Sequence, residues 1–343
     1  MNVKRLRALL NRRVFLQRAL SLPFMALLAE RVGFAEEPKP GIVEPTVDEA
    51  KAAIEAMFAT NATDVTPERL AACATIQRSV DRLRAAEFAS YFSADAQAAR
   101  EFEEERAVLR FLNASFDKAI KEIRETQVQE GTVVFWHIYN MGYVVKTPTQ
   151  TFAIDVKHRR ADELVPLIDF LLITHKHGDH YVQPFCEAVA DAGKPVVTNF
   201  LDDEWTTPAE GRDYVFGDCS VKARLVDHNA TLLKFVTTYE IDCGPKSGNV
   251  VVFHVGDACS VNQIKADEQV DVFIPHLAVG LDVPKAVNET LKPKTTLLSH
   301  ILELGHLIDK WRWSYEHGYN VVKKCANDSV ILPMWGEKIT YSR

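Results

Sequence analysis

The 343-residue sequence lacks the features that mark several common classes of protein. It has no excess of basic residues, since 40 Lys and Arg against 47 Asp and Glu give a formal net charge of −7. This balance argues against binding to the phosphates of nucleic acid. It also lacks an internal apolar run long enough for an ordinary transmembrane helix. We therefore expect no nucleic-acid partner and no stable membrane span in the mature protein.

Cysteine is scarce as well, with six residues in the chain and none in a Cys-x-x-Cys spacing. A zinc site built on cysteine pairs is therefore not expected. Cys219 and Cys243 flank a stretch that fits two antiparallel strands around a turn, so a disulfide between them is possible, although sequence alone does not establish it. Most of the six cysteines are better explained as buried, unreactive side chains.

The first 35 residues have the composition of an export signal. Arg12 and Arg13 precede a modestly apolar stretch, residues 19–29, and small residues precede Ala35. This order is typical of a signal peptide, and the paired arginines followed by Phe-Leu resemble a twin-arginine (Tat) signal. We expect cleavage after Ala35, recognition by the Tat export machinery and a location in the bacterial periplasm. The alternative is a basic amphipathic helix that stays attached.

Residues 36–130, the helical N-terminal segment, are rich in Ala, Glu, Arg and Gln, with almost no Gly or Pro after residue 46. Apolar residues recur in it at helical spacing, as in Val108, Leu112, Phe116, Ile120 and Ile123. Thr66 is suited to cap a helix that begins at Pro67. We predict three or four helices packed against the main domain, with charges on a solvated face. Nothing in this segment suggests catalysis.

Residues 131–343 are predicted to form the main domain. Short runs rich in Val, Phe and Trp first predict a series of antiparallel strands, and strands then alternate with helices. This pattern predicts an α/β fold, a four-layered αββα sandwich with two sheets between helical layers, preceded by the helical N-terminal segment. The expected strands are 132–139, 142–146, 151–156, 170–173, 195–198, 220–226, 233–241, 250–255, 272–275, 295–298 and 330–334, and the expected helices are 182–192, 282–291 and 307–324.

The most informative stretch of the sequence is residues 168–181. An apolar run, residues 170–173, has the length of a buried strand and stops at a cluster of polar side chains. Within six residues this cluster contains four groups that can bind a metal ion, namely His175, His177, Asp179 and His180. We expect this His-x-His-x-Asp-His pattern to occupy the loop at the C-terminal end of the strand.

More metal-binding candidates lie far away in the sequence. His228, Asp257 and His300 each come shortly after a predicted strand. Because loops at the same end of neighbouring strands converge in space, we expect these side chains to approach the central cluster. His276 and His306 compete with His300 for the last position, and either of them could line the substrate pocket instead.

The order of these residues resembles that of the metallo-β-lactamase-fold metal-dependent hydrolase superfamily, over residues 131–343. Gly256-Asp257 after a strand, and Lys-Pro-Lys at 292–294 before the strand that leads to His300, look most like the branch that includes ascorbate-6-phosphate lactonase. The chain departs from that branch near its first strands. Residues 136–142 read Trp-His-Ile-Tyr-Asn-Met-Gly, where the branch has Gly-His.

The resemblance implies a site for two metal ions. His175, His177 and His228 would hold the first ion, Asp179, His180 and His300 would hold the second, and Asp257 would bridge them. Asp155, at the end of a predicted strand, would fix a ligand histidine from outside the metal site. Imidazole and carboxylate ligands suit two Zn²⁺ ions, and Mn²⁺ or iron is possible as well.

The function that the resemblance implies is an exported dinuclear-metal hydrolase. A metal-bound hydroxide, oriented by Asp179, would cleave an ester, lactone or phosphoester bond of a small-molecule substrate. One alternative is a metal-bearing binding protein without turnover. Another is a redox enzyme on the same fold. The flavin-linked di-iron members of the fold carry glutamate where this chain has His177, which favours zinc and hydrolysis.

Other polar and aromatic residues are better explained without a role in the site. His254 lies inside a predicted strand and fits a hydrogen-bonded core histidine. Asn140 could reach the substrate but fits a polar loop residue better. His158 fits a surface residue. Trp311, on the predicted helix 307–324, could form a wall for the substrate but fits the core better.

Overall fold

Two β-sheets packed face to face form the centre of the computed structural model, which describes residues 39–343 except 278–279, 309 and 327–328. In spatial order, the first sheet contains β13 (Lys338–Ser342), β1 (Thr132–Tyr139), β2 (Gly142–Lys146), β3 (Thr151–Ile154), β4 (Phe170–Leu172) and β5 (Val196–Val197). The second contains β12 (Val330–Ile331), β11 (Thr295–Leu297), β10 (Val272–Ile274), β9 (Val251–His254), β8 (Val236–Asp242), β7 (Cys219–Val226) and β6 (Arg212–Phe216). The predicted signal peptide, residues 1–35, lies outside the described residues.

Apolar side chains from alternate positions of the strands fill the space between the sheets. On β1, Val133 and Phe135 belong to this inner core, whereas Val134 and Trp136 belong to the apolar cluster outside it. Phe170 of β4 stacks on Phe216 of β6, in the opposite sheet, with 4.3 Å between ring centroids. These contacts hold the two sheets in the face-to-face packing of a sandwich.

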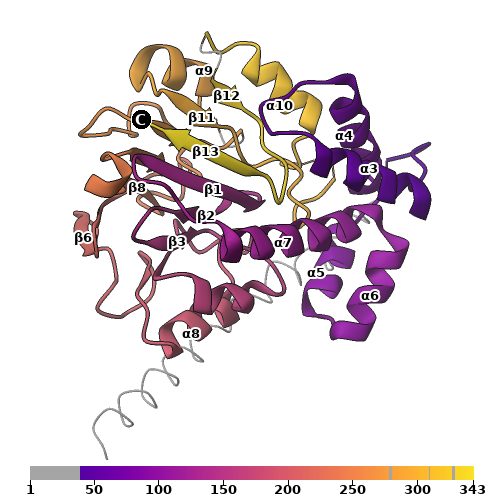
Figure 1. Ribbon diagram of the computed structural model, residues 1–343, viewed down its shortest axis with the longest axis horizontal. Helices are drawn as coiled ribbons and strands as arrows, with labels where there is room; N and C mark the ends of the chain where they lie inside the picture. The colour runs from indigo at the N-terminus through magenta and orange to yellow at the C-terminus, as the bar shows by residue number, and fades with distance from the viewer. Residues whose placement is uncertain (1–38, 278–279, 309, 327–328) are drawn as a thin grey trace, which may run out of the picture. The chain divides into compact units, whose positions relative to one another are not determined.

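Helices cover the outer faces of both sheets (Figure 1). On the first sheet lie α7 (Ala107–Glu125), the short helix η2 (Ala161–Leu167) and α8 (Gln183–Asp191). On the second lie α9 (Val283–Lys285), its π-helical continuation η4 (Ala286–Thr290) and α10 (Tyr315–Val322). The predicted four-layered αββα fold is therefore confirmed. No helix among the described residues combines the length and apolar character that a membrane span requires.

The helical N-terminal segment contains five helices where three or four were predicted. They are α3 (Val47–Ala59), α4 (Pro67–Val80), α5 (Ala85–Ser93), α6 (Ala96–Glu105) and α7. The prediction was wrong because the breaks contain neither Gly nor Pro. The carboxylate of Asp95, for example, accepts hydrogen bonds from the amides of Gln97 and Ala98 and so begins α6. The predicted cap Thr66 is confirmed, since its side chain accepts from the amide of Arg69.

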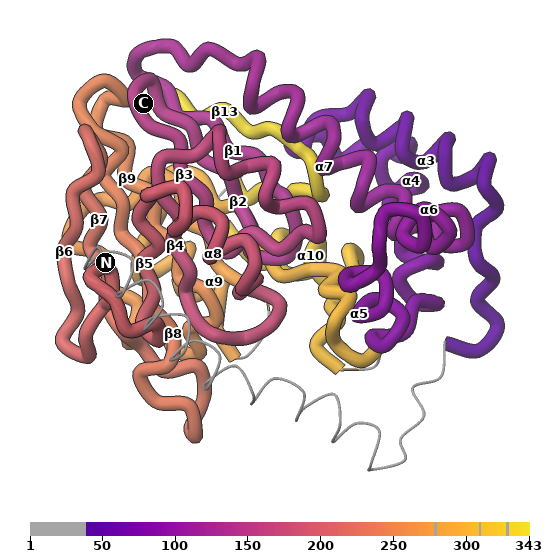
Figure 2. The backbone as a smooth tube through the Cα atoms, turned by 90° about the horizontal axis from the view of Figure 1, so that it is seen from below, coloured from indigo at the N-terminus to yellow at the C-terminus, as the bar shows by residue number. Residues whose placement is uncertain are grey.

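Figure 2 shows α3 to α6 grouped on one side of the sheets. Most of their charges face solvent as predicted, but Arg69 of α4 is buried. Its Nη2 lies 2.9 Å from Oε2 of Glu337, and it also donates to the hydroxyl of Tyr315. The helical N-terminal segment is thus fastened to the C-terminal part of the chain through a buried ion pair. The boundary at residue 131 between two domains stays a prediction.

Two strands were missed and one helix was predicted too long. Both missed strands, β6 and β13, lie at the edges of their sheets. Few of their residues are buried and many are polar, so the apolar pattern that would predict a strand is weak. The helix predicted over 307–324 begins only at Tyr315. Before it, Arg312 donates to the carbonyls of Leu304 and His306, which keeps that stretch in a loop. The last predicted strand, 330–334, ends at Ile331.

Two side-chain predictions need correction, and the possibility of a disulfide that the sequence left open is decided. All six cysteines are free thiols, so the possible disulfide between Cys219 and Cys243 is not formed. His158, predicted on the surface, is buried and stacks on Phe116 with 3.8 Å between ring centroids. Trp311, predicted in the core, is 59% exposed. The core prediction for His254 is confirmed, since the ring is buried and Nε2 lies 3.0 Å from the carbonyl of Met141.

Candidate metal centre

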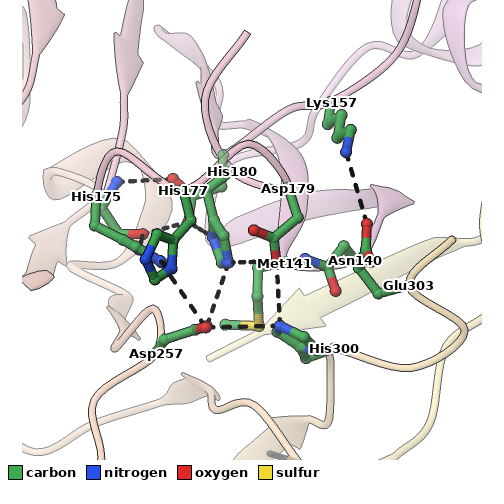
Figure 3. Close-up of polar contacts among 12 residues, drawn as sticks. Asn140, Met141, Lys157, His175, His177, Asp179, His180, Asp257, His300 and Glu303 are labelled. Atoms are coloured by element: carbon green, nitrogen blue, oxygen red, sulfur yellow. Dashed lines mark hydrogen bonds and ion pairs between the residues drawn. The ribbon is translucent and has the colours of Figure 1, made fainter. Parts of the chain in front are cut away.

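The structure brings all seven predicted metal-binding residues together, and Figure 3 shows most of them around Asp257. They come from the loops that follow β4, β7, β9 and β11. Two of these strands, β9 and β11, flank β10 in a parallel arrangement, so their C-terminal ends meet at one edge. β4 belongs to the other sheet, and the loop that follows it supplies four of the seven residues.

The first cluster consists of His175, His177, His228 and Asp257, with one ligand atom of each residue within 4.8 Å of all the others. Nε2 of His228 lies 3.5 Å from Oδ2 of Asp257, and Nε2 of His175 lies 3.9 Å from the same oxygen. Nδ1 of His177 lies 3.1 Å from Nε2 of His175. Three imidazoles and one carboxylate therefore converge on a single point.

The second cluster consists of Asp179, His180, His300 and again Asp257. Oδ2 of Asp179 lies 3.2 Å from Nε2 of His180 and 3.3 Å from Nε2 of His300. Asp257 places Oδ1 3.3 Å from Nε2 of His180. Asp257 thus turns Oδ1 toward His180 and Oδ2 toward His175 and His228, and Oδ2 also lies 3.6 Å from Nε2 of His300. Asp257 therefore belongs to both clusters, and its role as a bridge between two metal ions stays what the resemblance implies.

Several polar atoms of these clusters lack a hydrogen-bond partner, and a metal ion could take its place. Nε2 of His180, Nε2 of His300 and Oδ1 of Asp257 are buried and have no hydrogen-bond partner. Buried polar atoms without partners are costly, and a cation among them would satisfy all three. The residues therefore fit a pair of metal ions, one in each cluster. Their roles as ligands stay a prediction.

Asp155 orients two of the histidines from outside the clusters. Nδ1 of His180 donates to Oδ2 of Asp155 over 2.9 Å, and the hydroxyl of Thr174 donates to the same oxygen over 2.6 Å. Because Thr174 gives its proton to Asp155, its oxygen accepts from Nδ1 of His175 at 3.0 Å. Each ring therefore uses Nδ1 for this contact and turns Nε2 toward the clusters, where Nε2 can bind a cation once it carries no proton.

The charges of the site also suit a cation. Burial lowers the pKa of His175 well below its ordinary value and that of His177 to about 4, so both imidazoles are neutral at pH 7. Burial raises the pKa of the Asp257 carboxyl, but His180 and His300 outweigh this effect and hold the pKa well below its usual range. Burial alone would also lower the pKa of His180 and His300, but Asp179 and Asp257 outweigh it and raise the pKa of His180 well above 6.5 and that of His300 to about 10. A divalent metal would therefore replace a proton at each of these two rings.

Gly256 allows the β9 loop to place Asp257. Its φ is +48°, a conformation that favours glycine, and a Cβ at this position would lie 2.7 Å from Cβ of Thr174. The loop therefore packs directly on the residue that links His175 to Asp155. A larger residue would push the two loops apart.

Sequence reasoning missed the role of Asn140, which is buried and not a solvated loop residue. Its Nδ2 donates to Oδ2 of Asp179 over 3.1 Å, and its carbonyl accepts from the amide of His300 over 3.1 Å. Asn140 thus holds two members of the second cluster, as Figure 3 shows for the contact with Asp179. An Asn between two predicted strands is typical of a turn, and this is the sequence signal for the position of Asn140. In the structure its φ is +54°, as in such turns.

The two predicted pocket histidines lie at the edge of the second cluster. His276 is buried, its Nε2 donates to the carbonyl of Ala258 over 2.9 Å, and its ring lies 6.2 Å from that of His300. The ring of His306 lies 5.9 Å from that of His300 and nearly parallel to it. Nδ1 of His306 lies 2.9 Å from Oε2 of Glu303, a residue that sequence reasoning also missed.

No protein-family model matches this chain, and no curated protein matches it. Solved structures do match. They include Igni18, a metallo hydrolase from Ignicoccus hospitalis (15% identity, TM-score 0.46, covering 62% of this chain and 99% of that one). The metallo-β-lactamase-fold protein YhfI from Bacillus subtilis matches at 14% identity with a TM-score of 0.43, covering 61% of this chain and 99% of that one. CmlA, a diiron β-hydroxylase from Streptomyces venezuelae, matches at 13% identity with a TM-score of 0.45, covering 64% of this chain and 55% of that one. Function depends on the side chains of the site and not on a likeness of fold.

Proposed function

We propose that this protein is an exported dinuclear-metal hydrolase that cleaves an ester, lactone or phosphoester bond in a small molecule. The observation that supports this proposal is the sharing of Asp257 by two His and Asp clusters. A shared carboxylate sets two cations close together, which is the arrangement of two-metal hydrolytic sites. The side chains of both clusters other than that of His177 are buried.

Two divalent ions, when bound, lower the pKa of a coordinated water and stabilise negative charge that develops on the substrate. The chain's own residues prepare the site for this chemistry. Asp155 keeps the proton of His180 on Nδ1, and through Thr174 it does the same for His175. Asn140 restrains one oxygen of Asp179, so that this carboxylate can orient an attacking water as the resemblance implies.

The metal that we propose is zinc, because neutral imidazoles and carboxylates without thiolates suit Zn²⁺ in tetrahedral or five-coordinate sites. Mn²⁺ and iron accept the same donors. We further propose that the Tat machinery exports the folded protein to the periplasm, on the basis of the paired arginines and the apolar stretch of residues 1–35. Lactone and phosphoester substrates rank above β-lactams, because the Asp179-His180 pair resembles that of members of the superfamily that are not lactamases.

The experiment that tests this function combines elemental analysis with a substrate panel. The purified protein is expected to contain two zinc ions per chain and to hydrolyse at least one member of a panel of chromogenic esters, lactones and phosphodiesters. Two bound metals without turnover of any member would favour the metal-bearing binding protein. Two iron atoms with oxygen consumption in place of hydrolysis would favour the redox enzyme.

A further inference from the structure

The buried carboxylate of Glu303 lies beside the second cluster, and both of its oxygens contact other residues of the protein. Its Oε1 accepts from the hydroxyl of Tyr139 over 2.9 Å and lies 3.6 Å from Nζ of Lys157. Its Oε2 accepts from the amide of His306 and lies 2.9 Å from Nδ1 of that residue. Because both oxygens are already used, Glu303 is better suited to hold its neighbours than to bind a further metal ion.

His306 is the residue that Glu303 fixes next to the metal-binding residues. One of its ligand atoms lies within 4.8 Å of an oxygen of Asp179, and its ring stacks beside that of His300. The His306 side chain is 28% exposed, unlike those of His180 and His300. The exposed ring of Trp311 meets it edge-on at 5.9 Å. A row of rings therefore leads from the second cluster to the surface, and His306 is its middle member.

The helical N-terminal segment supports this arrangement through Lys157. Nζ of Lys157 lies 5.1 Å from the ring centre of Phe88 and 5.7 Å from that of Phe92, both on α5. The ring of Tyr139 adds a third aromatic face at 5.9 Å. Aromatic faces attract a cation, so α5 holds the ammonium group in place next to Glu303. Figure 3 shows Lys157 directed at Glu303.

Arg312 fastens the backbone of the same loop to the end of α4. Its guanidinium donates to the carbonyls of Val80 and Leu83 on the helical side, and to those of Leu304 and His306 on the loop side. The loop that carries His306 is therefore held twice by the helical N-terminal segment. One contact acts on its backbone, and the other acts on its side chains through Lys157 and Glu303.

We propose that His306 contacts the substrate beside the second metal position and that Glu303 and Lys157 are positioning residues for it, supported by α5. This inference rests on the proposed function and adds to it a purpose for the helical N-terminal segment. Removal of a carboxylate that fixes a metal-binding histidine typically lowers activity or metal affinity by about 10-fold to 100-fold, and we expect a comparable loss of activity when Glu303 is replaced. Apolar or aromatic groups of a substrate would lie against Trp311.

The first test compares zinc-loaded Glu303→Gln with Glu316→Gln, a matched change at an exposed glutamate of α10. On a chromogenic substrate that the wild type hydrolyses, Glu303→Gln is expected to lower kcat/KM by about tenfold while both metal ions stay bound. The ¹⁵N imidazole signals of His306, identified by their loss in His306→Gln, are expected to shift in Glu303→Gln and not in Glu316→Gln. Equal kcat/KM and unshifted signals in the two variants would overturn the proposal.

The second test separates positioning from folding and from the proposed function. Lys157→Met keeps an unbranched side chain among the aromatic rings, and it is expected to lower kcat/KM and shift the His306 signals in the same direction as Glu303→Gln. His306→Gln changes a partly exposed side chain, so it tests the substrate contact even where Glu303→Gln does not fold. A folded, two-metal His306→Gln with wild-type kcat/KM would overturn the contact. If the wild type turns over nothing, the proposed function fails, while the His306 signals still decide whether Glu303 positions the ring.

Discussion

Nδ1 of His180 donates to Oδ2 of Asp155 over 2.9 Å, and neither side chain is exposed to solvent. This contact decides which nitrogen of His180 can bind a cation. Through the hydroxyl of Thr174, the same carboxylate decides it for His175 in the first cluster. A single aspartate outside the clusters therefore orients one histidine in each of the two clusters.

Asp155→Asn is expected to weaken metal binding without removing any ligand. The amide oxygen can still accept a hydrogen bond from Thr174 or His180, but it carries no negative charge to favour the Nδ1–H form of His180. Loss of such a partner typically lowers metal affinity by about 10-fold to 100-fold. The affinity for Zn²⁺ would be measured by competition with a chromophoric chelator. Asp213→Asn, at an exposed aspartate of β6, is the control and should leave the affinity unchanged.

Gly256→Ala is expected to destabilise the protein and disturb the site. The added Cβ would meet Cβ of Thr174 at 2.7 Å and Cγ1 of Val236 at 2.9 Å, in a backbone conformation with positive φ. Overpacking of this kind costs about 1–3 kcal/mol in the free energy of unfolding. Gly131 also has positive φ but has no atom within 4 Å of the Cβ position, so Gly131→Ala measures the backbone strain alone. Equal losses in the two variants would contradict the steric account.

Glu337→Gln is expected to be strongly destabilising, because it leaves the buried guanidinium of Arg69 without its counter-charge. Removing one partner of a buried ion pair typically costs about 3–5 kcal/mol. Glu49 and Arg78 form a pair whose side chains are 47% and 41% exposed, and Glu49→Gln should cost far less stability than Glu337→Gln. Denaturant unfolding of both variants checks the difference, and a loss below 1 kcal/mol for Glu337→Gln would contradict it.

His158 is expected to make the stability fall in mild acid. Burial, with smaller effects from Arg160 and Arg159, lowers the pKa of His158 well below 6.5 in the folded protein. Below pH 6.5 the unfolded chain therefore binds a proton that the folded chain does not, and the free energy of unfolding decreases as the pH falls. For one such histidine the loss between pH 7.5 and 5.5 is about 1 kcal/mol.

His158→Phe removes this titration and keeps a ring to stack on Phe116. In metal-free protein, the decrease in stability between pH 7.5 and 5.5 should be smaller in His158→Phe than in the wild type by about 1 kcal/mol. Denaturant unfolding at the two pH values measures it. An identical decrease in both proteins would show that His158 does not titrate in this window.

The sequence predicted that the side chains of the two clusters would come together, and it did so where the metal-binding residue types also follow predicted strands. The cluster from His175 to His180 is local, and the distant Asp257 and His300 follow strands whose ends converge. Asn140 could not be predicted in this way, because it acts on Asp179, 39 positions away, and Glu303 could not, because it is held by Tyr139, 164 positions away. Only the packing of distant segments reveals such partners.

The errors in the fold have similar physical causes. The edge strands β6 and β13 bury only part of their side chains, so their patterns are weak. The loop before α10 has apolar residues that suit a helix, and it stays irregular because Arg312 binds its carbonyls and those of α4. A tertiary contact of one arginine outweighs the local preference of that stretch.

The most direct test of the whole account is the metal content of the wild type and three variants, measured by elemental analysis of folded protein. His228→Ala and His300→Ala each remove a ligand from one cluster, whereas Asp257→Ala removes the carboxylate that both clusters share. We expect two metal ions per chain in the wild type, one in each histidine variant and almost none in Asp257→Ala. Unchanged metal content in folded Asp257→Ala would contradict the shared, two-metal centre.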